Sequence, residues 1–185
     1  MRLFVAVVPP EDALDALATA LCSLGGSNPS LRWTRREAWH VTLAFLGEVN
    51  GTSLSRLIPR LERGARRHTA FRLALSGAGA FPSPRRANVL WGGLAGDRKA
   101  LGDLAATVSA AARRAGALPP DAGRKYHPHL TLARCRTPAD VRPIVDGLSG
   151  FQGDPWTAGE IFLIRSRLQG QPRYETLGSW PLSPP

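Results

Sequence analysis

One short pattern occurs twice in this chain and constrains its fold more than any other feature. It consists of a histidine, an apolar residue, a threonine and a second apolar residue, as His40-Val41-Thr42-Leu43 and His129-Leu130-Thr131-Leu132. Both copies lie in apolar runs typical of β-strands, in which successive side chains point to opposite faces. Each copy therefore presents an imidazole and a hydroxyl on one face and aliphatic side chains on the other.

The segments around the two copies follow the same order: a strand, a helix, the motif strand, a helix and a strand. In the first half the flanking elements are expected at 3–7, 11–24, 52–66 and 69–80; in the second half they are expected at 88–92, 97–115, 137–148 and 160–168. A glycine pair at 25–26 is expected to end the first helix, and a loop is expected over 116–123. This order predicts an α+β fold with an internal duplication, in halves of about 1–80 and 81–185.

Two strands of this kind, related by a pseudo-twofold axis, would present two histidines and two threonines to one groove. Histidine titrates near neutral pH, so a pair of imidazoles suits paired acid and base catalysis. A zinc site at His40, His127 and His129 is an alternative, although no acidic residue lies near the His-Pro-His segment and the threonines would then be unexplained. A non-catalytic RNA-binding module is a second alternative.

Charge and cysteine content indicate the partners and the compartment. The chain has 24 Lys and Arg against 14 Asp and Glu, a net charge of +10, and most of the excess is arginine. Guanidinium groups match phosphate geometry, which favours an anionic partner such as RNA, but a basic surface kept for solubility fits as well. With Cys22 and Cys135 as the only cysteines and no long apolar run, we expect a cytoplasmic protein without a membrane span.

With these paired motifs the chain resembles a known family, the 2H phosphoesterases. Within that family it resembles the LigT-type RNA 2′,3′-cyclic phosphodiesterases, also called 2′–5′ RNA ligases. Nearly the whole chain contributes to the resemblance, through "RLFVAVVPP", "LRWTRREAWHVTLAFLGEV", "NVLWGGL", "HPHLTLAR" and "EIFLIRSRL" with "YETLGSWPL". The resemblance implies a single domain over 1–185. It consists of two pseudo-symmetric lobes, each an antiparallel β-sheet with outer helices, around a central cleft, with strand exchange between the lobes allowed.

The resemblance also implies the reaction, which is hydrolysis of a 2′,3′-cyclic phosphate at an RNA end to a 2′-phosphate. It assigns His40 as proton donor and His129 as proton acceptor, with Thr42 and Thr131 binding the phosphate and with no metal or cofactor. Arg134 is expected to contact the substrate, although strict alternation places it on the face opposite His129 and a bulge or strand end would be needed. The motif alone does not say which histidine is the acid.

Several properties stay open at this stage. Only the resemblance implies the substrate RNA, such as tRNA fragments, and a reverse 2′–5′ ligation. It equally allows the reactions of other 2H phosphoesterases, on 2′–5′ oligoadenylate or ADP-ribose cyclic phosphate. A monomer is expected because the pseudo-twofold axis closes the site within one chain. Four aromatic residues could either stack on a base or belong to the core: Trp33, Phe45, Trp91 and Tyr126.

Overall fold

The computed structural model describes residues 1–24, 28–117, 125–167 and 173–184. The strands are β1 (Arg2–Val7), β2 (Leu31–Trp33), β3 (Val41–Glu48), β4 (Phe71–Phe81), β5 (Ala87–Gly96), β6 (Leu130–Ala139), β7 (Trp156–Ala158), β8 (Glu160–Ser166) and β9 (Tyr174–Pro181). The helices are α1 (Glu11–Ser23), α2 (Gly51–Ala65), α3 (Arg98–Ala115) and α4 (Arg142–Gly147), with 3-10 turns η1 (Arg36–Ala38) and η2 (Pro84–Arg86). The expected glycine stop at 25–26, most of the expected loop over 116–123 and the expected strand end at 168 lie outside the described residues.

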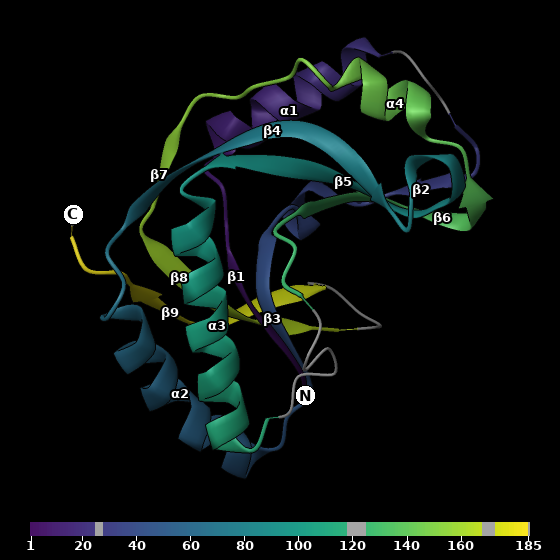
Figure 1. Ribbon diagram of the computed structural model, residues 1–185. Coiled ribbons are helices and arrows are strands. Elements are labelled where there is room, and N and C mark those ends of the chain that lie inside the picture. Colours follow the sequence, from purple (N-terminus) through teal and green to yellow (C-terminus); the bar gives the residue numbers. More distant parts are fainter. Residues whose placement is uncertain (25–27, 118–124, 168–172, 185) are drawn as a thin grey trace.

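These strands form one antiparallel sheet that curves into two lobes (Figure 1). The strand order is β7-β4-β5-β6-β3-β1-β8-β9, and β2 pairs with β6. We call β3, β1, β8 and β9 the first lobe, and β7, β4, β5, β6 and β2 the second lobe. The described register joins the two lobes through a single pair, Val41 of β3 with Leu130 of β6. The sheet is therefore nearly divided at the place where the two motifs meet.

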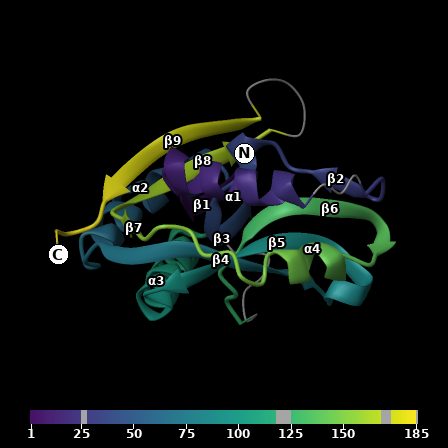
Figure 2. The ribbon, with the colours of Figure 1, turned by 90° about the horizontal axis from the view of Figure 1, so that it is seen from above.

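Helices cover the outer side of both lobes. The pair α2 and α3 packs on the first lobe, with α3 against β3 and α2 against β9, while α1 and α4 pack against β4. In Figure 2, β8 and β9 lie on one side of α1, with β4, β5 and α4 on the other. Apolar residues at helical spacing bury these faces, as Leu101, Leu104 and Val108 of α3 do. Within the described ranges, no helix is both long and apolar enough to cross a membrane.

The lobes do not coincide with the two halves of the sequence. The first half supplies β1 and β3 to the first lobe, but it sends α1, β2 and β4 to the second lobe. The second half supplies β5 and β6 to the second lobe, but it sends α3, β8 and β9 to the first. The predicted α+β class with two antiparallel lobes and outer helices is confirmed. The duplication of the halves stays a prediction.

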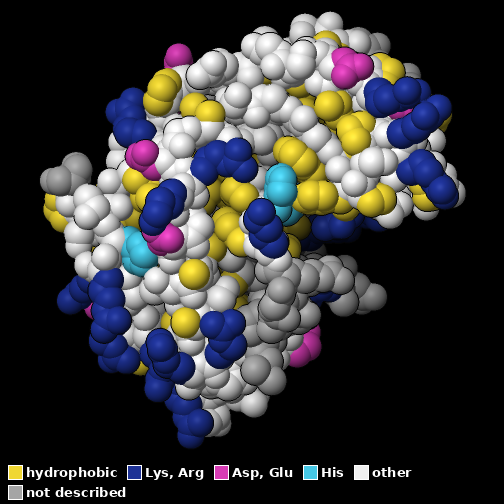
Figure 3. Space-filling model, viewed as in Figure 1, with side chains coloured by type: hydrophobic (Ala, Val, Ile, Leu, Met, Phe, Trp, Pro, Cys, Tyr) yellow, Lys and Arg dark blue, Asp and Glu magenta, His cyan; other side chains and the backbone are white. Residues whose placement is uncertain are grey.

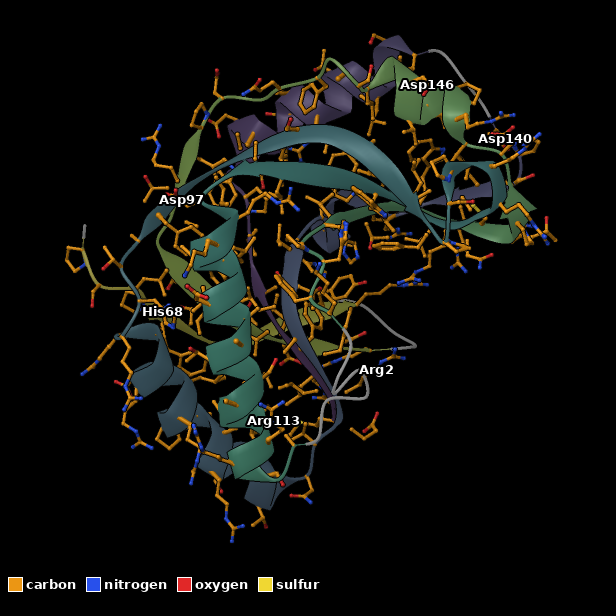
Figure 4. All side chains as sticks on the ribbon, in the orientation of Figure 1. Arg2, His68, Asp97, Arg113, Asp140 and Asp146 are labelled. Carbon is orange, nitrogen blue, oxygen red and sulfur yellow. The ribbon has the colours of Figure 1, made fainter. Side chains whose placement is uncertain are left out.

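The helix expected over 137–148 is wrong in its first part. Strand β6 continues to Ala139, and the helix α4 begins only at Arg142. Pro138 lies where the β5–β6 register is irregular, so its missing N–H breaks no regular ladder position. The Asp140 carboxylate accepts hydrogen bonds from the Arg142 backbone N–H at 3.0 Å and from its guanidinium, which fixes the start of the helix at the tip of the second lobe (Figure 4).

Candidate active site

The two motifs meet at the junction of the lobes. Val41 and Leu130, which form the pair that links β3 to β6, are both wholly buried. The residues on either side of this pair point the other way, and they line one cleft: His40, Thr42, His129 and Thr131. Both histidines come immediately before their strands rather than within them. The hollow between the lobes is visible in Figure 3.

A bulge in β6 turns Arg134 into the same cleft. Along β5 the pairing partner changes from Thr131 to Ala133 over one step, which leaves Leu132 as an extra residue. Leu132 and Ala133 are consequently both buried, and the alternation is reversed beyond them. Arg134 is exposed and lines the cleft. The bulge that strict alternation required is therefore present.

The same device occurs in β3. The pairing partner along β1 changes from Thr42 to Ala44, so Leu43 is the extra residue, and Leu43 and Ala44 are both buried. Phe45, five positions after its histidine, is 41% exposed and lines the cleft. Phe45 thus occupies in the first lobe the place that Arg134 occupies in the second.

Apolar and aromatic groups surround His40. Its ring stacks on Phe4 at a centroid distance of 4.6 Å, and the Tyr174 ring lies at 5.6 Å in an edge arrangement. Burial, and to a lesser extent the positive charge of His129, lowers the pKa of His40 to about 4. His40 is therefore neutral at pH 7.

His129 is held in one tautomer. Its Nδ1 lies 2.7 Å from the backbone oxygen of His127. A carbonyl oxygen only accepts, so Nδ1 carries the hydrogen in the neutral ring and Nε2 is left with a lone pair. Burial lowers the pKa of His129, the hydrogen bond to His127 opposes this shift, and the charges of His127 and Arg134 lower the pKa further.

Two hydrogen-bonding side chains hold the motif strands in place. The Thr34 hydroxyl donates to the backbone oxygens of Thr131 at 2.9 Å and Leu132 at 2.8 Å, and it accepts from Trp39 Nε1 at 3.0 Å. The hydroxyl of the half-buried Tyr126, whose pKa is raised by burial, donates to the Thr42 backbone oxygen at 3.1 Å. The sequence does not mark Thr34 as a site residue, because no motif identifies a residue that acts only through contacts distant in sequence.

The other candidate residues have different surroundings. Trp91 packs on His127 at a ring-centroid distance of 4.9 Å, so it supports the motif segment and does not line the cleft. Cys135 is half-buried, and burial raises the pKa of its thiol. No set of three or more His, Cys, Asp or Glu side chains among the described residues is arranged to hold a metal ion. His68 bonds to Thr107 of α3 at 2.8 Å and does not line the cleft, and Figure 4 shows it near the end of α2.

The comparisons with known proteins agree with this architecture. The family described as LigT like Phosphoesterase matches residues 7–91 and 95–174, and the chain belongs to this family. The resemblance noted from the paired motifs is thereby confirmed.

Relatives and solved structures extend this result. The RNA 2′,3′-cyclic phosphodiesterase of Thermus thermophilus is 32% identical over 199 residues, covering 98% of this chain and 90% of that protein. That of Geobacillus stearothermophilus is 29% identical over 180 residues, covering 97% of this chain but only 56% of its own length. The structure of Escherichia coli LigT complexed with 3′-AMP has a TM-score of 0.79 at 27% identity, covering 98% of this chain and 97% of that one. The structure of the Thermus thermophilus protein TT0787 has a TM-score of 0.77 at 27% identity and covers 98% of both chains.

Proposed function

We propose that the cleft hydrolyses 2′,3′-cyclic phosphate ends of RNA to 2′-phosphates, with His40 and His129 as a metal-free acid–base pair. The observation that carries this proposal is the convergence of two imidazoles and two hydroxyls at the single β3–β6 pair. The relatives named as RNA 2′,3′-cyclic phosphodiesterases support the substrate class.

The two-lobed arrangement suits the stereochemistry of the reaction. Water attacks phosphorus, the bond from phosphorus to the ribose O3′ breaks, and the attacking and leaving oxygens lie on opposite sides. One histidine must remove a proton from the water and the other must protonate O3′ as it leaves. His40 comes from the first lobe and His129 from the second, so one imidazole is available on each side. The Thr42 and Thr131 hydroxyls donate to the non-bridging oxygens, on which negative charge increases.

The tautomer of His129 supports its role as proton acceptor. His129 has its Nδ1 hydrogen directed at the His127 oxygen, which leaves Nε2 to accept a proton from water. The surroundings of His40 disfavour its charged form in the empty cleft. A bound phosphodiester anion beside the ring favours the imidazolium, so His40 takes up a proton as substrate binds. It then becomes the donor to O3′.

Phe45 and Arg134 complete the site from the two lobes. Arg134 supplies a permanent positive charge to the phosphate or to the nucleoside. Phe45 supplies a flat apolar face on which the terminal base can stack, because much of its ring is exposed to the cleft.

An end-group assay tests this function. An oligoribonucleotide ending in a 2′,3′-cyclic phosphate is incubated with the protein in EDTA, beside His40→Ala, His129→Ala and the distant control His68→Ala. We expect a 2′-phosphate product, with a loss of roughly 10²–10⁴-fold in each motif variant and little loss in the control. No product from folded wild-type protein would refute the proposed substrate and leave the sibling cyclic-phosphate reactions to be tested. Activity that disappears in EDTA would refute the metal-free mechanism.

A further inference from the structure

A second groove opens beside the catalytic cleft. Its volume is about 710 Å³, against about 360 Å³ for the cleft. The two cavities share the lining residues Thr34, Ala38, Arg134 and Tyr174, so they lie next to each other. The groove follows β2 and the adjoining part of β6. We call it the β2 groove.

The β2 groove is strongly basic. Among the described residues, five arginines and one acidic residue, Glu37, line it: Arg32, Arg35, Arg134, Arg136 and Arg173. Within the described part of the chain, none of the five forms an ion pair with an acidic side chain. Lys and Arg side chains border the hollow from the second lobe in Figure 3. Closely spaced arginines without acidic partners favour a polyanion over a neutral ligand.

An aromatic side chain lies among these arginines. Trp33 is 40% exposed and lines the β2 groove, as does its neighbour Arg32. Within the described residues, β2 is short and pairs with β6 alone. A positively charged groove with an exposed aromatic ring is typical of single-stranded nucleic acid binding, in which the ring stacks on a base.

We propose that the β2 groove binds the RNA strand that precedes the terminal nucleotide, and that the protein therefore prefers oligonucleotides to cyclic mononucleotides. Trp33 stacks on a base upstream of the end, and Arg32 and Arg136 contact backbone phosphates. This inference rests on the proposed function, because the cleft must hold the cyclic end while the groove holds the preceding strand.

The test compares two substrates in the same variants. Hydrolysis of a 2′,3′-cyclic mononucleotide reports the cleft alone, since Arg32, Trp33 and Arg136 do not line it. Hydrolysis of a hexaribonucleotide with the same cyclic end reports the cleft and the groove together. For Trp33→Ala we expect an unchanged rate on the mononucleotide and a loss of about 5- to 150-fold in kcat/KM on the hexamer, mainly through KM. Trp33→Phe, which keeps a stacking face, should recover much of the loss.

The arginines are tested by the salt dependence of hexamer binding. The double variant Arg32→Gln/Arg136→Gln should reduce the slope of log K against log salt by about 1.4, since each lost phosphate contact on a single strand contributes about 0.7. The matched control is Arg60→Gln/Arg63→Gln, which removes the same charge from the shallow basic patch between α2 and α3. That control should leave the ratio of hexamer to mononucleotide activity unchanged.

The outcomes separate this inference from the proposed function. An unchanged ratio in Trp33→Ala, or an equal loss in Arg60→Gln/Arg63→Gln, would overturn the inference while leaving the catalytic proposal intact. If wild-type protein hydrolyses neither substrate, the catalytic proposal fails. Fluorescence anisotropy with a hexamer ending in a 3′-hydroxyl then tests the groove directly, where Trp33→Ala must weaken binding relative to wild type for the inference to stand.

Discussion

Replacing Thr34 by valine should destabilise the protein and weaken the active site together. Valine keeps the shape of the side chain but removes the hydroxyl that joins three groups: the backbone oxygens of Thr131 and Leu132, and Trp39 Nε1. Leu132 keeps a partner, because the Thr34 backbone N–H donates to its oxygen at 2.9 Å. Trp39, which is 8% exposed and adjoins His40, loses the hydrogen bond of its indole N–H.

The expected magnitude follows from these groups. A buried donor left without a partner costs about 1–3 kcal/mol, and the lost bond to Thr131 adds about 1 kcal/mol. We therefore expect Thr34→Val to lower the free energy of unfolding by about 2–4 kcal/mol. For a domain of this size this corresponds to a fall in Tm of about 4–16 °C. Because Trp39 precedes His40 and Thr131 lies two positions after His129, which together form the proposed catalytic pair, kcat should fall as well.

Urea and thermal unfolding, each followed by circular dichroism, measure this effect. Thr34→Ser keeps the hydroxyl and should recover most of the stability. The double variant Thr34→Val/Trp39→Phe removes the indole N–H as well as its acceptor, so it should lose less than the sum of the two single variants. A Thr34→Val protein within about 0.5 kcal/mol of wild type, or one no less stable than Thr34→Ser, would contradict the argument.

Three further outcomes are expected. Since His40 must be protonated to act as the acid and its pKa is about 4 in the empty cleft, kcat/KM should fall as the pH rises through that low pKa. Bound phosphate raises this pKa, so the falling limb of the kcat pH profile should lie at higher pH than that of kcat/KM. If the two falling limbs coincide in steady-state measurements, His40 is not the proton donor. Arg134→Ala should raise KM for a cyclic-phosphate oligonucleotide about 10- to 100-fold. Arg134→Lys should recover only part of this loss, because an ammonium group cannot make the paired contact of a guanidinium. An unchanged KM in Arg134→Ala would exclude the contact. Gly96→Ala should lower the free energy of unfolding, measured by urea titration, by about 2 kcal/mol or more. The reason is that φ at Gly96 is +92° and the added Cβ would lie 2.5 Å from the Arg72 backbone oxygen. The control Gly102→Ala, on the open face of α3, should be neutral or stabilising in the same titration.

The sequence predicted the structure correctly where the local apolar pattern and the packing agree. The leucine spacing of α1, α2 and α3 predicted their bounds to within one or two residues, because each helix buries one continuous stripe. The repeated His-x-Thr motif predicted that the two strands would share a cleft. It could not show that they meet through one residue pair, since this depends on how the whole sheet curves.

The orientation of Arg134 shows why simple alternation was insufficient. A period of two assumes a regular strand, and one extra residue reverses it. A signal was nonetheless present, because the two copies agree beyond the motif as "HVTLAF" and "HLTLAR". In both, two adjacent apolar residues follow the threonine before a large side chain. That break in alternation predicts a bulge in each strand and brings Phe45 and Arg134 into one cleft.

Other parts of the site depend on contacts that local sequence cannot show. Thr34 and Thr131 are 97 positions apart, and Tyr126 lies 84 positions from Thr42. Likewise, the sequence predicted a helix from residue 137, but pairing with β5 extends the strand through Pro138 to Ala139. In each of these cases long-range contacts between segments, and not the local sequence preference, determine the structure. The monomeric state, the cytoplasmic location, the tRNA-fragment substrates and the reverse ligation stay predictions.

The interleaving of the two halves has a consequence for folding. Neither half contains a complete lobe, because β8 and β9 reach the first lobe from the second half and β4 reaches the second lobe from the first half. A chain cut after residue 81 would leave each fragment with unpaired strand edges and with helices separated from the surface they cover. We therefore expect the two lobes to order together, so that the two motif histidines are brought together or separated in the same cooperative transition. Partial unfolding that keeps one motif histidine in place and releases the other is disfavoured by this topology.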